Sequence, residues 1–220
     1  MINFINSQKN TFLAITAMVV GVIFIDIHGL IVKYLGGEYS TIQLALFRNT
    51  FAIIPLILLL IYNKESSDLF KNLSKKFILF CFVRGSCFLA INILYYIAIN
   101  NMEFATASTL TFSSTFFIVI LSIFFLGDKV GIYRWSAVII GFIGVVMIMR
   151  PNSSIFSYYS ILPILVAFLW AVQVIVLKFI PDNFSTGKIQ FYSLFSSFLG
   201  SLVFIFFTTG HTYIETQSDF

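Results

Sequence analysis

The chain has 220 residues, of which 59% are hydrophobic and only 10% are charged, and its mean hydropathy is +0.98. An ordinary soluble domain carries about 25% charged residues, so this composition excludes a soluble globular protein and predicts an all-α polytopic membrane protein. The formal net charge of +4 comes without a basic groove interleaved with exposed aromatic residues, so it gives no support to nucleic-acid binding.

Seven stretches are long and apolar enough to cross a bilayer, because a hydrocarbon core about 30 Å thick needs about 20 apolar residues of helix. In chain order they cover residues 11–35, 39–61, 77–99, 103–126, 131–149, 155–180 and 185–209. The first is too long for a signal peptide and has no obvious cleavage site, so we interpret it as a retained span. We interpret residues 208–220 as a loop outside the cytoplasm.

Basic residues gather on one side of these spans. With the N-terminus in the cytoplasm, the inside segments and helix ends hold Lys9, Lys64, Lys71, Lys75, Lys76, Lys129, Arg134, Lys178 and Lys188. The outside holds only Lys33 and Arg150, apart from arginines within spans. This positive-inside bias predicts a cytoplasmic N-terminus.

The chain contains an approximate copy of itself at a separation of 145 residues. Without a gap, KYLGGEYSTIQLALFR at 33–48 aligns with KFIPDNFSTGKIQFYS at 178–193, so that Ser40 meets Ser185. Similarity at a fixed period indicates a duplicated unit. Because five helices precede the second copy, that copy enters the membrane upside down, which predicts an inverted repeat.

We therefore divide the chain into a first five-helix unit at residues 11–150 and an incomplete second unit at residues 155–220. The separation of 145 residues makes residue 220 equivalent to residue 75 of the first unit. We expect that roughly three more helices would complete the second repeat, giving about ten in all. A naturally shortened seven-helix protein is the alternative.

Residues 105–151 resemble the end of an EamA repeat in the drug/metabolite transporter superfamily. The shared features are small residues that open the fourth helix, a short FLG-acid turn, and a glycine-spaced fifth helix that ends near a proline. Arg48 in the second helix and Trp170 in the second repeat also fit the pattern. Two departures are Thr115, near the usual place of a proline, and Asp128, which replaces the usual glutamate of the turn.

The resemblance implies a ten-helix carrier for small polar metabolites, with a solute and the lipid bilayer as partners and a homodimer left open. Alternating access between the two inverted repeats would move the solute. The segment at 33–48 is similar to a branch of bacterial S-adenosylmethionine uptake carriers, so the expected cargo is an amino acid or a derivative such as S-adenosylmethionine. A non-transporting scaffold or inactive carrier fragment is the alternative. Frequent Phe, Ile, Asn and Lys suit an AT-rich bacterial genome and favour the inner membrane.

Two charged residues lie deep within predicted spans. Asp26 and Arg48 each lie nine residues from the outer end of their helix, which is about 13 Å at a rise of 1.5 Å per residue. An ionised side chain at this depth costs at least about 2.5 to 3.5 kcal/mol. The second copy has Ala171 and Ser193 at the equivalent positions. We expect neither charge to face lipid: the two either serve a solute site or gate, or pair to lock the first helix against the second.

Further polar candidates lie in other spans. Arg84, Asn92 and Tyr95 share one face of the third helix, although Arg84 could instead snorkel to the cytoplasmic headgroups. Trp170 and Tyr96 could line a solute pocket or simply fill the core. In the fourth span we expect four hydroxyls to bond backbone carbonyls more readily than a solute, namely Ser108, Thr111, Thr115 and Ser122.

Catalysis and metal binding find little support in the sequence. The two histidines, His28 and His211, have no cysteine partners at a zinc-binding spacing. Cys81 and Cys87 lie six residues apart on one predicted helix, which is too far for a disulfide. We therefore expect a non-enzymatic protein without a cofactor or metal. His28 is a candidate for proton coupling, with a packed neutral imidazole as the alternative.

Overall fold

The computed structural model describes residues 2–71, 73–149, 158–181 and 183–218, which form helices and contain no strand. The α-helices are α1 (Ile2–Leu35), α2 (Thr41–Tyr62), α3 (Lys75–Asn101), α4 (Phe104–Thr111), α5 (Ser114–Leu126), α6 (Ile132–Met149), α7 (Ile161–Lys178) and α8 (Thr186–Ser218). Short 3₁₀ turns cover Ser66–Asp68 and Tyr158–Ser160. The predicted all-α fold is confirmed.

Six segments of the described chain are long and apolar enough to cross a membrane, with α4 and α5 counted together as one. The predicted span at 131–149 corresponds to α6, whose apolar stretch, Trp135–Met147, is shorter. The expectation of about seven membrane helices therefore holds. Arg150 and the predicted start of the sixth span near residue 155 lie outside the described residues.

Two helices extend beyond the predicted spans. Helix α8 continues to Ser218, so the loop predicted at 208–220 is wrong for residues 208–218. Helix α1 already begins at Ile2. Hydropathy predicts only where a helix leaves the apolar layer of the membrane. The helix itself continues until its backbone hydrogen bonds are interrupted, for example by a proline. Neither extension contains a proline, so both can remain helical.

The fourth span is bent where a single helix was predicted at 103–126. Backbone bonds between residues three apart, from Phe112 to Thr109 and from Ser113 to Leu110, tighten the turn between α4 and α5. The Ser113 hydroxyl also donates to the Leu110 carbonyl at 2.7 Å, and such bonding bends helices. The bend therefore forms without a proline. Three of the four predicted hydroxyls do bond backbone carbonyls, namely Ser108, Thr111 and Ser122.

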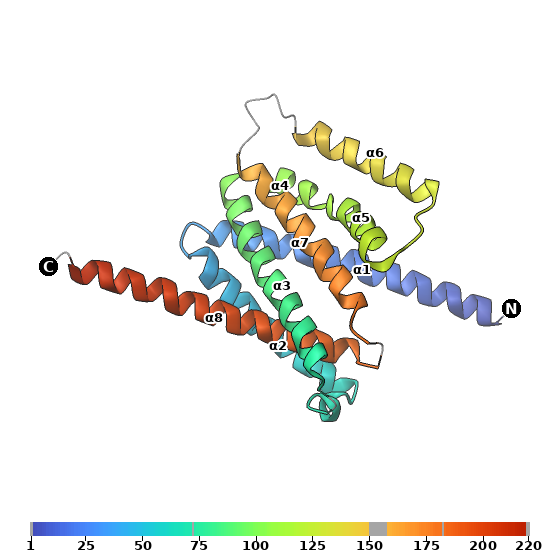
Figure 1. The fold of residues 1–220 in the computed structure, drawn as a ribbon, viewed down its shortest axis with the longest axis horizontal. Helices are drawn as coiled ribbons and strands as arrows, with labels where there is room; N and C mark the ends of the chain where they lie inside the picture. Colours follow the sequence, from blue (N-terminus) through green and yellow to red (C-terminus); the bar gives the residue numbers. More distant parts are fainter. Residues whose placement is uncertain (1, 72, 150–157, 182, 219–220) are drawn as a thin grey trace.

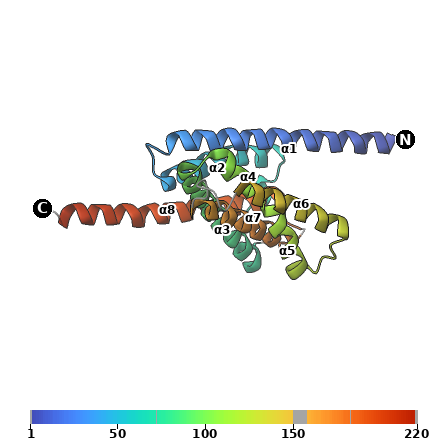
Figure 2. The same cartoon turned by 90° about the horizontal axis from the view of Figure 1, so that it is seen from above.

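Helix α3 lies at the centre of the bundle and packs along both α7 and α8 (Figure 1). Helix α2 also packs on α8, and α5 packs on α7, while α6 lies at the edge. The N-terminal part of α1 and the C-terminal part of α8 project in opposite directions (Figures 1 and 2). Buried apolar residues form one cluster at each end of α3: Val32, Leu44, Ala45, Tyr96, Ile99 and Ala107 in one, and Phe77, Cys81, Ile180 and Ile189 in the other.

Small residues bring α3 and α8 close together. Ser193, Ser197 and Ser201 stand one turn apart on α8 and are 4%, 0% and 0% exposed. Small side chains at membrane helix interfaces allow such close approach. At Gly85 of α3, an added Cβ would collide with the backbone oxygen of Ser193. The fully buried Asn49 of α2 adds a cross-helix bond, donating to the Ser197 hydroxyl at 3.1 Å.

The aligned Ser-Thr pairs of the two sequence copies take the same local structure. Helix α2 begins at Thr41 and α8 at Thr186, the positions that the alignment superimposes. In each case the preceding serine hydroxyl accepts from the backbone three residues later, at 3.3 Å for Ser40 and 3.2 Å for Ser185. Each serine therefore caps its helix.

Replacing Gly85 with alanine is expected to lower the free energy of unfolding by about 1 to 3 kcal/mol, because the methyl group would press on a backbone atom that cannot rotate away. Unfolding in detergent micelles would measure it. Gly141→Ala on α6 is the matched control, since a Cβ there would meet nothing within 4 Å. Equal unfolding midpoints for the two variants would contradict the close approach of α3 and α8.

Candidate functional site

The first polar cluster lies between α1, α2 and α3. Phe88, Asn92 and Tyr96 stand four residues apart on one face of α3. Arg48 of α2 places its guanidinium carbon 4.5 Å from the centre of the Phe88 ring. His28 of α1 places Nε2 3.4 Å from the Tyr96 hydroxyl. We call these five residues the Arg48 cluster.

Two donors of the Arg48 cluster are buried and have no hydrogen-bond partner in the described part of the chain. They are Nη1 of Arg48 and Nδ2 of Asn92, a side chain only 6% exposed. A buried polar group without a partner costs free energy, and the Phe88 ring offsets only part of that cost for Arg48. The missing partners are acceptors, and a negatively charged acceptor suits the guanidinium best.

Asp26 does not supply that acceptor. Within the described residues the ion pair that forms joins Lys71 and Asp68, so the pairing of Asp26 with Arg48, one of the two alternatives, does not form. The Asp26 side chain is exposed, whereas Gly29, three residues further along α1, is buried against the Phe104 ring of α4. The expectation that Asp26 faces away from lipid stays a prediction. Equal depth did not place the two charges on facing surfaces.

Arg84 belongs to a second polar cluster, between α3, α7 and α8. Its Nη1 donates to Gln190 Oε1 at 3.1 Å and to the Ser193 hydroxyl at 3.3 Å. Gln173 Nε2 donates to the Arg84 backbone oxygen at 3.2 Å. The guanidinium thus points toward α8, and its buried Nε has no partner among the described residues. We call these four residues the Arg84 cluster.

The sequence repeat connects the two clusters. Gln173 and Ser193, which contact Arg84, occupy the positions that the alignment makes equivalent to His28 and Arg48. The same two helix positions thus carry neutral partners for an arginine in the second copy, and a histidine and an arginine in the first. These positions bear polar side chains toward α3 in both copies.

The remaining candidates lie apart from these contacts. Trp170 is 42% exposed on α7 and makes no hydrogen bond or ring contact with either cluster in the part described. Tyr95 is half-buried and packs against the apolar cluster that contains Tyr96. Cys81 and Cys87 are free thiols, as predicted. The described residues include no group of three or more His, Cys, Asp or Glu side chains that could hold a metal ion.

A third polar region lies in the loop between α2 and α3. There a cavity of about 250 Å³ is lined by polar residues that include Glu65, Asp68, Lys71, Ser185 and Lys188. Lys71 Nζ lies 2.9 Å from the Asp68 carboxylate, and this hydrogen bond holds the pKa of Asp68 below its ordinary value. Because both side chains are exposed, the pair contributes little to stability.

Sequence reasoning missed four residues of these polar regions: Asn49, Gln173, Gln190 and Lys188. All four are polar side chains within or at the start of apolar spans, which is the signal that could have identified them. Lys188 was counted only as one of the inside charges, yet it is 6% exposed. Among the neutral amides of the spans, sequence reasoning selected only Asn92 as a candidate.

Comparison with known proteins gives one family match. A model described as the EamA-like transporter family matches residues 12–150. The chain is 26% identical over 161 residues to an S-adenosylmethionine uptake transporter of Rickettsia bellii, covering 73% of this chain and 54% of that protein. It is 26% identical over 165 residues to a pseudopaline exporter of Pseudomonas aeruginosa, covering 74% and 56%.

A shorter match reaches higher identity. The chain is 38% identical over 66 residues to a riboflavin transporter of Rhizobium johnstonii, covering 30% of this chain and 22% of that protein. The chain spans about half the length of the relatives that match most of it. No solved structure matches.

The two arginines are expected to differ in their effect on stability. Arg84→Met should lower the free energy of unfolding by about 1 to 3 kcal/mol, because it leaves the buried polar groups of α8 without their donor. Arg48→Met should leave it unchanged or raise it, because it removes a buried cation with an unpaired nitrogen. Unfolding midpoints in detergent measure both. An equal loss in the two variants would make Arg48 a structural residue.

Proposed function

Because the chain belongs to the EamA-like transporter family, we propose that it is a secondary-active transporter of a small polar organic metabolite. Two inverted repeats would give the solute access to each side of the membrane in turn. The observation that carries the proposal is the Arg48 cluster, where a cation inside an apolar span has a buried nitrogen without a partner in the described chain. A membrane protein retains such a costly group chiefly for function.

We assign recognition of the negative end of the solute to Arg48. A guanidinium binds a carboxylate through two parallel hydrogen bonds, and Asn92 offers a further amide donor. Phe88, Tyr95 and Tyr96 supply aromatic surface beside these donors. The solute would thus provide the acceptors that the cluster lacks.

Two ionisable groups on α1 are assigned to coupling and gating. His28 contacts the Tyr96 hydroxyl and could exchange a proton as the solute's charge arrives. Asp26 is exposed at the same predicted depth as Arg48, where a carboxylate needs a partner or water. Rotation of α1 between the two access states would change its surroundings.

The bend between α4 and α5 is a candidate hinge for these states. Tightened turns within a helix often mark functional hinges, and this one lies inside a membrane span, between Thr111 and Ser114. Its bonds run between residues three apart and not four. The helix could therefore straighten or bend further by exchanging one set of partners for the other.

An amino acid or its derivative is the proposed cargo, with S-adenosylmethionine as the first compound to test. Proteins with that printed cargo match about three quarters of this chain, whereas the riboflavin transporter matches 30%. An amino acid also carries the carboxylate that suits Arg48. The positive-inside bias supports a cytoplasmic N-terminus in the bacterial inner membrane.

Proteoliposomes that contain the protein are expected to show saturable, solute-dependent flux of a carboxylate compound from a panel of S-adenosylmethionine, riboflavin and free amino acids. Arg48→Ala should weaken apparent affinity by about 10- to 100-fold, as expected for the loss of a charged hydrogen bond. Arg48→Lys should recover little if the contact is bidentate. Lys76→Ala, which removes an exposed charge, is the control and should transport normally.

Two results would count against this function. Flux that is equal in the parent and Arg48→Ala proteins would separate transport from the Arg48 cluster. An absence of flux for every compound would instead favour a non-transporting membrane scaffold.

A further inference from the structure

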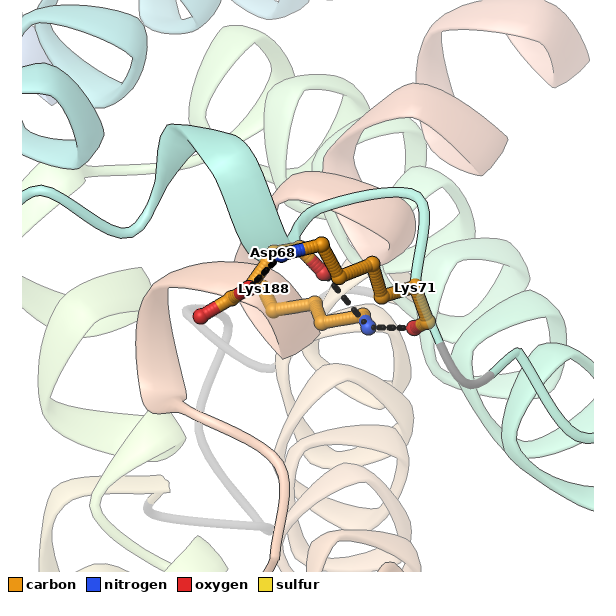
Figure 3. Close-up of polar contacts among 3 residues, drawn as sticks. All are labelled: Asp68, Lys71 and Lys188. Carbon is orange, nitrogen blue, oxygen red and sulfur yellow. Dashed lines mark hydrogen bonds and ion pairs between the residues drawn. The ribbon is translucent and has the colours of Figure 1, made fainter.

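Lys188 is a buried cation that forms no ion pair with a carboxylate of the described residues. It lies in the first turn of α8, is 6% exposed, and donates from Nζ to the backbone oxygens of Asp68, at 2.9 Å, and Lys71 (Figure 3). Its Nζ lies 5.3 Å from the centre of the Phe184 ring and 5.7 Å from that of Phe77. The carboxylate of Asp68 is bonded to Lys71 instead. Lys188 therefore binds the backbone of the α2–α3 loop.

Two more side chains of the α8 start hold the same loop. The Ser185 hydroxyl donates to Glu65 Oε2 at 2.8 Å, and the Tyr192 hydroxyl donates to the Leu69 backbone oxygen at 3.1 Å. Residues 185, 188 and 192 are spaced by three and four, so they lie on one face of the helix start. We call Ser185, Lys188 and Tyr192 with their bonds to residues 65–71 the latch.

An apolar layer lies between the latch and the Arg84 cluster. Phe77 stacks on Phe184 with ring centres 4.1 Å apart and meets Tyr192 edge-on at 5.5 Å. One turn further along α3, Cys81 is 1% exposed in the same apolar cluster. Arg84 follows one turn deeper. The latch and this apolar layer therefore lie between the α2–α3 loop and the Arg84 cluster.

The first copy has no equivalent of the latch at the corresponding place. Gln43 occupies the position that aligns with Lys188, and its side chain accepts from the Ser40 backbone nitrogen at 3.0 Å within its own helix cap. At the opposite end of α3, Lys33 Nζ donates to the Met102 backbone oxygen at 2.9 Å. That bond stays within the first copy, whereas the latch joins the two copies.

We propose that the latch is a gate, which rests on the transport function proposed above. In this structure it closes the pathway at the end that holds the α2–α3 loop. Separation of Lys188 from the loop would open a route from that membrane face to the Arg84 cluster. Opening exchanges hydrogen bonds to backbone oxygens for bonds to water, which the adjoining cavity of about 250 Å³ can hold.

Cys81 gives a direct readout because it lies behind the latch and the chain has only two cysteines. In a Cys87→Ser background, a membrane-impermeant maleimide would be applied to the protein in lipid nanodiscs, where both faces are accessible. Lys188→Met should raise the rate of Cys81 modification by about tenfold or more, because it removes both charged hydrogen bonds to the loop and the loss of even one is worth about that factor. Tyr192→Phe, which keeps the ring packing on Phe77, should raise it by a smaller factor.

Lys71→Met is the matched control. It removes a lysine from the same loop, but its side chain is exposed and the backbone oxygen that Lys188 binds remains. Its labelling rate should stay within about twofold of the parent, as is usual for loss of an exposed pair. Unfolding midpoints of all variants should be measured in parallel, so that a general loss of structure is recognised.

If the rate of Cys81 modification were unchanged in both Lys188→Met and Tyr192→Phe, the gate would be overturned. The latch would then be a permanent structural contact between the two sequence copies. The gate would also be overturned if the Cys81 labelling rate rose in proportion to the fall in unfolding midpoint in every variant, Lys71→Met included. Neither readout needs a solute. Arg48-dependent flux with no latch response would therefore reject only the gate, whereas a latch response without flux would reject only transport.

Discussion

The close contact of α3 with α8 is the constraint on which the other features depend. Gly85 lets the backbone of α3 approach the serine face of α8, where a methyl group would already collide with Ser193. This spacing brings Arg84 within hydrogen-bond distance of α8. Two turns earlier it brings Phe77 onto Tyr192. The Arg84 cluster and the latch are therefore consequences of one helix pair, and a change in that spacing would alter both together.

Polar groups in the spans fall into three kinds, which differ in the partner that completes their hydrogen bonds. Hydroxyls such as Ser108 bond carbonyls of their own helix, so they cost little and carry no information about function. Arg84 donates from Nη1 to Gln190 and Ser193 of α8 and so links the two sequence copies, although its Nε has no partner in the described chain. Arg48 and Asn92 each retain a buried donor without a partner in the described chain. A solute site needs groups of the third kind, because a fully bonded group has little left to offer a ligand.

The sequence was sufficient to predict features that depend only on how deep a residue lies along its helix in the membrane. Apolar length predicted the helices because a backbone in lipid must bond within itself. Depth also identified Arg48 as unusual. Depth could not say which way a side chain faces. It therefore left the pairing of Asp26 with Arg48, which does not form, as one of two alternatives, and it did not predict the contact of Arg84 with α8. The bend at Ser113 was missed as well, because it depends on which carbonyl a hydroxyl selects.

The aligned residues Gln43 and Lys188 show how two copies of one sequence can form different contacts at the two ends of the helix bundle. In one copy this position closes its own helix cap, and in the other it reaches a different loop. Glutamine and lysine codons differ by a single base, so one point mutation after gene duplication separates these two roles. A single base change at this position is thus enough to exchange a side chain that closes its own helix cap for one that can bind a separate loop.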